Sequence, residues 1–299
     1  MAAVTRLVFS PHYTVDLGGH VFPTEKFQLA ARLLAPVCRI TAPREPARED
    51  MLLAHDPDWV DKAISGRMSL ADETLMELPF TPRVARAHRL QAAGTILACR
   101  HALKRGAGLH AGGGSHHAFR GHGEGFCVIN DIAIGILKMR AEGRIRRAAV
   151  IDLDVHQGNG TAAIFADDPD TFTFSMHQKD LYPEIKERSS LDVELRAGMG
   201  DRAYLDRLRE SLPAVFEHKP ELVIYQAGVD GWERDLLGGL KLSAAGLRAR
   251  DELVRKGCQS HGVAVAVTLG GGYARDVMET ARLHAQTLLV FAGRSEEIS

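Results

Sequence analysis

The sequence contains only four cysteines in 299 residues, and none of them belongs to a C-x-x-C pair. This scarcity argues against a disulfide framework and predicts reduced thiols in a cytoplasmic protein. The chain also lacks a charge excess, because 37 Lys and Arg residues balance 38 Asp and Glu residues. A nucleic-acid-binding domain usually carries a basic excess, so none is expected here. No apolar run approaches the ~18 residues of a transmembrane helix, and the first residues lack the apolar core of a secretory signal.

The sequence shows no internal repeat, no low-complexity tract and no long linker. We therefore predict one domain over residues 1–299. The unusual feature of the composition is its 14 histidines.

The apolar runs predict an α/β fold. The runs AAVI, LVIY and VAVAV are apolar at successive positions, which is typical of parallel strands buried on both faces. The predicted strands are Arg6–Phe9, Val37–Thr41, Ala148–Ile151, Thr171–Ser175, Leu222–Gln226 and Val263–Thr268. The predicted helices are Pro82–Arg105, Asp201–Leu212 and Ser243–His261. In such sheets ligands bind beyond the carboxyl ends of the strands, so functional residues are expected there.

Acidic residues and a histidine follow two of these strands. Asp152, Asp154 and His156 share one face of extended backbone, and Asp230 follows a second strand between glycines. A salt-bridged strand end would explain any one of the aspartates. Together, Asp154, His156 and Asp230 predict an open metal site suited to Zn²⁺, with Fe²⁺ also possible.

Two glycine-rich segments carry candidates for acid–base chemistry. His116 and His117 follow three glycines, which suggests a pair of acid–base imidazoles, with a solvated loop as the alternative. Tyr273 follows another three glycines after a strand and could donate a hydrogen bond to an oxyanion. Phe126 lies among glycines and is either a channel wall or a core residue.

The segments GGGSHHA, DLDVHQGNG, AGVDG and LGGGY together resemble the zinc-dependent histone deacetylase family. The segment HQGNG and the stretch from Tyr182 to Leu195 look most like class IV deacetylases and their bacterial relatives. The resemblance implies a single-domain arginase/deacetylase fold, with a central eight-stranded, mainly parallel sheet flanked by helices.

The same resemblance implies roles for individual residues. The implied zinc ligands are Asp154, His156 and Asp230, and a structural K⁺ or Na⁺ ion is expected nearby. The implied catalytic residues are His116, His117, Tyr273, Asp152 and Asn159, with His117 as the general base. The implied substrate-binding residues are Gly125, Phe126 and Leu237.

Asn159 departs from the family pattern, in which many members have an aspartate. A neutral amide stabilises an imidazolium less than a carboxylate does. We therefore expect His117 to be neutral more readily than His116.

The implied activity is hydrolysis of an acyl-lysine amide, or of a related acylated amine, to a carboxylate and a free amine. An acetylpolyamine or another small acyl-amide is the alternative substrate. A dimanganese, arginase-like site is disfavoured because Gly158 and Trp232 occupy the positions where further ligands would be needed. A regulatory binding module that keeps the fold is the non-catalytic alternative. The segment Met76–Thr81 is expected to border the entrance of the site, with Phe80 in contact with substrate or in the core.

Overall fold

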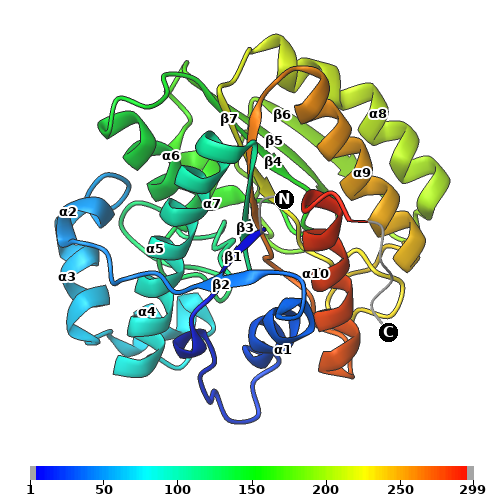
Figure 1. The fold of residues 1–299 in the computed structure, drawn as a ribbon. Helices are drawn as coiled ribbons and strands as arrows, with labels where there is room; N and C mark the ends of the chain where they lie inside the picture. Colours follow the sequence, from blue (N-terminus) through cyan, green and yellow to red (C-terminus); the bar gives the residue numbers. More distant parts are fainter. Residues whose placement is uncertain (1–4, 295–299) are drawn as a thin grey trace.

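Eight strands form one sheet at the centre of the structure (Figure 1), a computed structural model that describes residues 5–294. The ends of the predicted domain, residues 1–4 and 295–299, lie outside the described residues. The strands are β1 Arg6–Val8, β2 Arg39–Thr41, β3 Ala107–His110, β4 Ala148–Asp152, β5 Thr171–Gln178, β6 Leu191–Leu195, β7 Leu222–Gln226 and β8 Ala264–Thr268. Their order is β2-β1-β3-β8-β7-β4-β5-β6, and every pairing is parallel. The predicted α/β class and eight-stranded sheet are confirmed.

Helices cover both faces of the sheet (Figure 1). The helices are η1 Pro11–Tyr13, α1 Glu25–Leu34, α2 Arg48–Met51, α3 Pro57–Ser65, α4 Leu70–Met76, α5 Pro82–Arg105, α6 Asp131–Ala141, α7 Asn159–Ile164, α8 Asp201–Glu217, α9 Ala244–Ser260 and α10 Val277–Phe291. Helices α1, α8, α9 and α10 enclose one hydrophobic core, and helices α2–α7 enclose the other. Because both faces are buried, the central strands are apolar at successive positions.

The long helix α5 has the bounds that its sequence predicts. The Thr81 hydroxyl accepts a hydrogen bond from the backbone N–H of Val84 at 3.2 Å, and Pro82 occupies the first turn. Gly106 follows the last turn with a φ of 87°, a conformation that favours glycine.

Two strands of the sheet are absent from the sequence prediction. Strand β3 has only four residues and includes a glycine, so its apolar pattern is too short to recognise. Strand β6 lies at the sheet edge and is mostly half-buried, so it lacks a continuous apolar run.

Two other elements extend by three or more residues beyond their predicted ends. Helix α8 continues past Pro213 to Glu217, because Val215 and Phe216 pack into the core. Strand β5 extends to Gln178, because its last residues pair with β6.

The strand register places the functional segments side by side. Asp152 at the end of β4 pairs with Gln226 of β7, and Gln226 pairs with Thr268 of β8. The segments that follow β4, β7 and β8 therefore start at the same level at the centre of the sheet.

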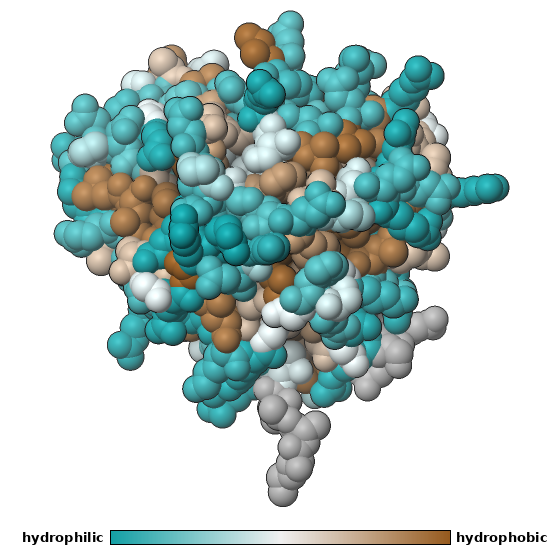
Figure 2. All heavy atoms as spheres, turned by 90° about the horizontal axis from the view of Figure 1, so that it is seen from above, coloured by the Kyte–Doolittle hydropathy of each residue, from teal (hydrophilic) through white to brown (hydrophobic). Residues whose placement is uncertain are grey.

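The surface seen from above in Figure 2 is mainly hydrophilic, with separate apolar patches. Within residues 5–294, no helix combines the length and the apolar character needed to cross a lipid bilayer. All four cysteines are free thiols and are buried.

Candidate active site

Strands β4 and β7 bring three possible metal ligands together. Asp154 and His156 lie in the turn after β4, and Asp230 follows β7. One ligand atom from each residue lies within 4.8 Å of the other two, and all three side chains are buried. The structure thus assembles the predicted group, which could hold a metal ion.

The two carboxylates of this group carry more negative charge than its one histidine can neutralise. Nδ1 of His156 lies 3.2 Å from Oδ1 of Asp154 and 3.1 Å from Oδ2 of Asp230. Burial and the nearby Asp154 raise the pKa of Asp230 to about 7. Because two buried carboxylates that share one imidazole are costly, a cation would stabilise them. The oxygen and nitrogen donors fit a divalent ion such as Zn²⁺ or Fe²⁺.

Two glycines let the backbone approach these carboxylates. A Cβ atom on Gly228 would lie 2.1 Å from Oδ2 of Asp154, and one on Gly271 would lie 2.0 Å from Oδ2 of Asp230. The backbone N–H of Gly271 donates to Oδ2 of Asp154 at 2.8 Å. Any side chain at either position would displace a ligand.

The loop after β3 holds His116 and His117 in the interior, where they are 3% and 5% exposed. Asp131, at the start of α6, accepts backbone hydrogen bonds from Ser115 at 2.7 Å and from Gly114 at 3.0 Å. The alternative of a solvated loop is therefore wrong. A glycine-rich loop can be buried here because a carboxylate satisfies its N–H groups.

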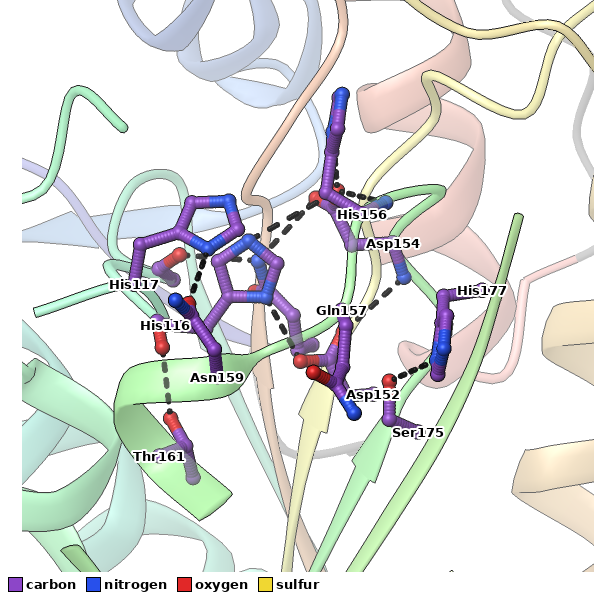
Figure 3. A network of polar contacts seen from close by, with 12 residues as sticks. His116, His117, Asp152, Asp154, His156, Gln157, Asn159, Thr161, Ser175 and His177 are labelled. Carbon is purple, nitrogen blue, oxygen red and sulfur yellow. Dashed lines mark hydrogen bonds and ion pairs between the residues drawn. The ribbon is translucent and has the colours of Figure 1, made fainter. Parts of the chain in front are cut away.

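The two histidines have different partners (Figure 3). Nδ1 of His116 lies 2.7 Å from Oδ2 of Asp152, whereas Nδ1 of His117 lies 2.7 Å from Oδ1 of Asn159. Burial opposes the charged form of His116, but Asp152 and Asp154 outweigh it and raise the His116 pKa to about 9. Burial, followed by the nearby His116 and His156, lowers the pKa of His117 well below its ordinary value. The pKa of His117 therefore lies below that of His116, in the direction that the sequence predicts.

Tyr273 and the two histidines line one pocket of about 30 Å³, which is enough for at least one water molecule. Burial raises the pKa of Tyr273, so its hydroxyl stays protonated and can donate a hydrogen bond. Helix α5 contributes His88 and Gln91 to the same pocket. The local sequence assigns neither residue to the site, because only the packing of α5 reveals their position.

Lys26 is a residue of this site that the sequence did not indicate. Its Nζ donates to the backbone oxygens of Gly270 at 2.8 Å and Gly272 at 3.2 Å, and it lies 4.9 Å from the centre of the Tyr273 ring. Burial lowers the pKa of Lys26 to about 8, although nearby carboxylates oppose the shift. The lysine therefore anchors the turn that carries Tyr273.

Asp235 anchors the other side of that turn. Its carboxylate accepts backbone hydrogen bonds from Tyr273 at 2.6 Å and from Leu237 at 2.9 Å. Leu237 is half-buried in the segment between β7 and α9. Its role in the wall of a substrate tunnel stays a prediction.

Phe126 and Tyr182 lie near the mouth of the site. Phe126 is half-buried, has a φ of 65° and stacks on Phe22 at 5.8 Å, so it is not an ordinary core residue. Tyr182, which the sequence analysis did not assign to the site, lies edge-on to the ring of His117 at 4.9 Å. Gly125 lies close to both Tyr182 and His117, because a Cβ atom there would lie 2.7 Å from the Tyr182 ring and 2.8 Å from the His117 ring. A rare φ at a non-glycine residue beside a pocket is typical of functional sites.

Within the segment Met76–Thr81, Phe80 and Met76 are both buried in the core enclosed by α2–α7. Phe80 was predicted either to contact substrate or to lie in the core, and the structure places it in the core. Glu77, with a φ of 50°, is the residue of this segment that lines the outer groove described below.

The structure provides no ligands for a second metal at the two positions considered. Trp232 is buried in the hydrophobic core, and Gly158 packs against Asp152 and His116. Within residues 5–294, the Asp154–His156–Asp230 group is the one cluster of this kind.

Comparisons with known proteins agree with this architecture. A family described as "Histone deacetylase domain" matches residues 20–289. An uncharacterised protein of Picosynechococcus is 38% identical, over 93% of this chain and 95% of its own length. Histone deacetylase 2 of Arabidopsis thaliana is 31% identical, over 94% of this chain and 77% of its own length.

A crystal structure of the HDA15 HD domain has a TM-score of 0.82 and 23% identity, and the match covers 99% of this chain and 90% of that one. At this identity the likeness concerns the fold, and it confirms the fold class. The match over most of the chain shows that the protein belongs to the histone deacetylase family, whose members are deacetylase hydrolases.

Proposed function

We propose that this chain hydrolyses the amide bond of an acylated lysine or a related acylated amine, releasing a carboxylate and a free amine. The supporting observation is that a base, a hydrogen-bond donor and a metal-binding group meet at one place. His117 and Tyr273 line the same pocket, and the His117 ring lies 6.1 Å from the ring of His156.

Asp154, His156 and Asp230 would hold the metal, which we propose to be Zn²⁺, with Fe²⁺ as the alternative. When bound, such an ion polarises the acyl carbonyl and lowers the pKa of a water molecule. A K⁺ or Na⁺ ion would bind near Asp152, which pairs with Ser175 of the neighbouring strand.

The chain's own residues then move the proton. His117 is neutral and its Nδ1 is engaged by Asn159, so Nε2 is the atom that takes a proton from the attacking water. The same nitrogen returns the proton to the leaving amine. Asp152 keeps His116 charged, and this charge stabilises a developing oxyanion. Tyr273 donates a hydrogen bond to the carbonyl oxygen as that oxygen gains charge.

An open groove of about 1040 Å³ lies outside the site, beyond Asn159. Apolar side chains, including Leu75 and Ile185, line it together with the carboxylates of Glu77 and Glu187, and no Lys or Arg of the described residues does. This lining suits a substrate that is both apolar and cationic, such as a basic peptide that carries an acyl-lysine. An acetylpolyamine or another small acyl-amide remains the second candidate, because it is cationic as well. The substrate is proposed to be a cytoplasmic protein or small molecule, with no direct binding of nucleic acid.

Hydrolysis of acyl-lysine peptides tests the proposal. The peptides carry acyl chains from acetyl to myristoyl, and acetylpolyamines are assayed alongside them. Each substrate is assayed before and after the enzyme is treated with a chelator. We expect release of free lysine that stops on chelation and returns with Zn²⁺. A folded, metal-loaded protein that binds acyl-lysine but releases no carboxylate would instead support the alternative of a non-catalytic binding module.

An aspartate at position 159 is expected to move the acidic limb of the pH–rate profile to higher pH. A carboxylate beside His117 would stabilise its charged form, so the base becomes protonated at a higher pH, by about 1 unit or more. The variant needs a second change, since Glu124 Oε2 lies 2.9 Å from Asn159 Nδ2 and two carboxylates would repel at that distance. The measurement is kcat/KM against pH for Asn159→Asp combined with Glu124→Gln, with Glu124→Gln alone as the control. An unchanged limb would remove His117 as the base.

A further inference from the structure

Glu124 lies outside the catalytic motifs, directly before Gly125 in the sequence, and contacts Asn159, the hydrogen-bonding partner of His117. Its side chain is 18% exposed. Oε2 accepts from Nδ2 of Asn159 at 2.9 Å and from the hydroxyl of Tyr182 at 3.2 Å, whereas Oε1 lies 3.1 Å from Nε2 of His122. The carboxylate therefore contacts two residues that themselves contact His117.

A carboxylate at this place determines which way the Asn159 amide faces. A carboxylate accepts hydrogen bonds and does not donate them, whereas an amide has one donor end and one acceptor end. The NH₂ group of Asn159 must therefore face Glu124, so Oδ1 faces Nδ1 of His117 at 2.7 Å. With the opposite amide orientation, two acceptors would face each other.

The amide orientation in turn determines the tautomer of His117. Because Oδ1 of Asn159 can only accept, Nδ1 of His117 must carry the hydrogen, and Nε2 keeps its lone pair. A reversed amide would favour the other tautomer, in which Nε2 is protonated and cannot act as a base. His117 is buried, so water does little to compensate for a wrong partner.

Tyr182 gives the carboxylate a second link to the same histidine. Burial raises the pKa of Tyr182, so its hydroxyl stays protonated and donates to Glu124. The ring of Tyr182 covers His117 edge-on at 4.9 Å. One carboxylate thus supports both the hydrogen-bonding partner and one aromatic neighbour of His117.

We propose that Glu124 is a positioning residue, which acts through Asn159 to hold His117 in the tautomer that can accept a proton at Nε2. This proposal rests on the proposed function, in which His117 is the base. It differs from the arrangement of His116, whose Nδ1 contacts the carboxylate of Asp152 directly. At His117 the carboxylate of Glu124 acts through the Asn159 amide and orients the ring without contacting it.

The first test is Glu124→Met, which keeps the length of the side chain and removes the acceptor. In the zinc-loaded enzyme we expect kcat to fall about 10–100-fold, as for other residues that orient a functional histidine, with KM within about 2-fold. The ¹⁵N chemical shifts of His117, assigned by their loss in His117→Asn, should show hydrogen moving from Nδ1 to Nε2. Unchanged kcat, or lower kcat with Nδ1 still protonated, would overturn the proposal.

A double-mutant cycle separates this role from a general structural one. Asn159→Leu removes the amide, so Glu124→Met in that background should lower kcat by no more than about 2-fold further. Additive effects would mean that Glu124 acts independently of Asn159 and would also overturn the proposal. Glu45→Met, which breaks surface ion pairs with Arg86 and Arg89, controls for an unspecific loss of stability.

Glu124→Gln provides the test if the methionine variant does not fold. A glutamine can present either its oxygen or its NH₂ group to Asn159, so we expect both tautomers of His117 and a smaller fall in kcat, about 3–10-fold. A single unchanged tautomer with unchanged kcat overturns the proposal. If Asp154→Asn and Tyr273→Phe also leave hydrolysis intact, the proposed function fails instead.

Discussion

Asp154→Asn is expected to abolish both metal binding and hydrolysis. The change removes an anionic ligand from the Asp154–His156–Asp230 group and replaces one of two oxygens by an NH₂ group; one of these oxygens accepts from Gly271 N–H, and the other contacts Nδ1 of His156. A catalytic metal supplies several kcal/mol of charge stabilisation, so we expect kcat/KM to fall by about 10³-fold or more. Metal content by mass spectrometry should fall in parallel.

Thermal unfolding distinguishes this effect from misfolding. A metal that binds only the folded state raises the Tm, so a chelator should lower the Tm of the wild-type protein and leave that of the variant unchanged. Asp206→Asn is the matched control, because it neutralises an exposed aspartate in α8 that pairs with Arg209. A variant that keeps its metal and its rate would show that Asp154 is not a ligand.

Tyr273→Phe is expected to lower kcat about 10²–10³-fold, with little change in KM, since loss of one oxyanion donor typically has this effect. The ring would keep its contacts with Phe126, at 6.0 Å, and with Nζ of Lys26, at 4.9 Å. The variant should therefore stay folded, with an unchanged Tm.

The matched control for this prediction is Tyr204→Phe. It removes the same hydroxyl from a buried ring of α8 that does not line the pocket. Its kcat should equal that of the wild type. A Tyr273→Phe enzyme with wild-type kcat would remove the tyrosine from the mechanism.

Local sequence was sufficient to identify strands β4, β7 and β8 and helices α5, α8 and α9, but it did not identify helix α10. Strands β4, β7 and β8 are buried on both faces, so their runs are apolar throughout, and α5 begins and ends at residues with clear capping signals. Strands β3 and β6 gave no such signal, because one is short and the other is a half-buried edge strand. The complete eight-stranded sheet came from the family resemblance.

Local sequence was also sufficient to identify part of the candidate site. Asp152, Asp154 and His156 lie on one short segment whose spacing already places them together, and the structure brings Asp154 and His156 next to Asp230. Glycines next to these motifs are explained by close backbone approach, as at Gly271.

The sequence by itself determined the type of sheet, the candidate ligand group and the pair of candidate acid–base histidines, because these features depend on neighbouring residues or on strand ends. Only the tertiary structure decided what supports them. Lys26 reaches a turn 244 residues away, and Glu124 contacts Asn159 across 35 residues. Such contacts leave no pattern in the sequence, because they arise from packing between distant segments and not from local periodicity.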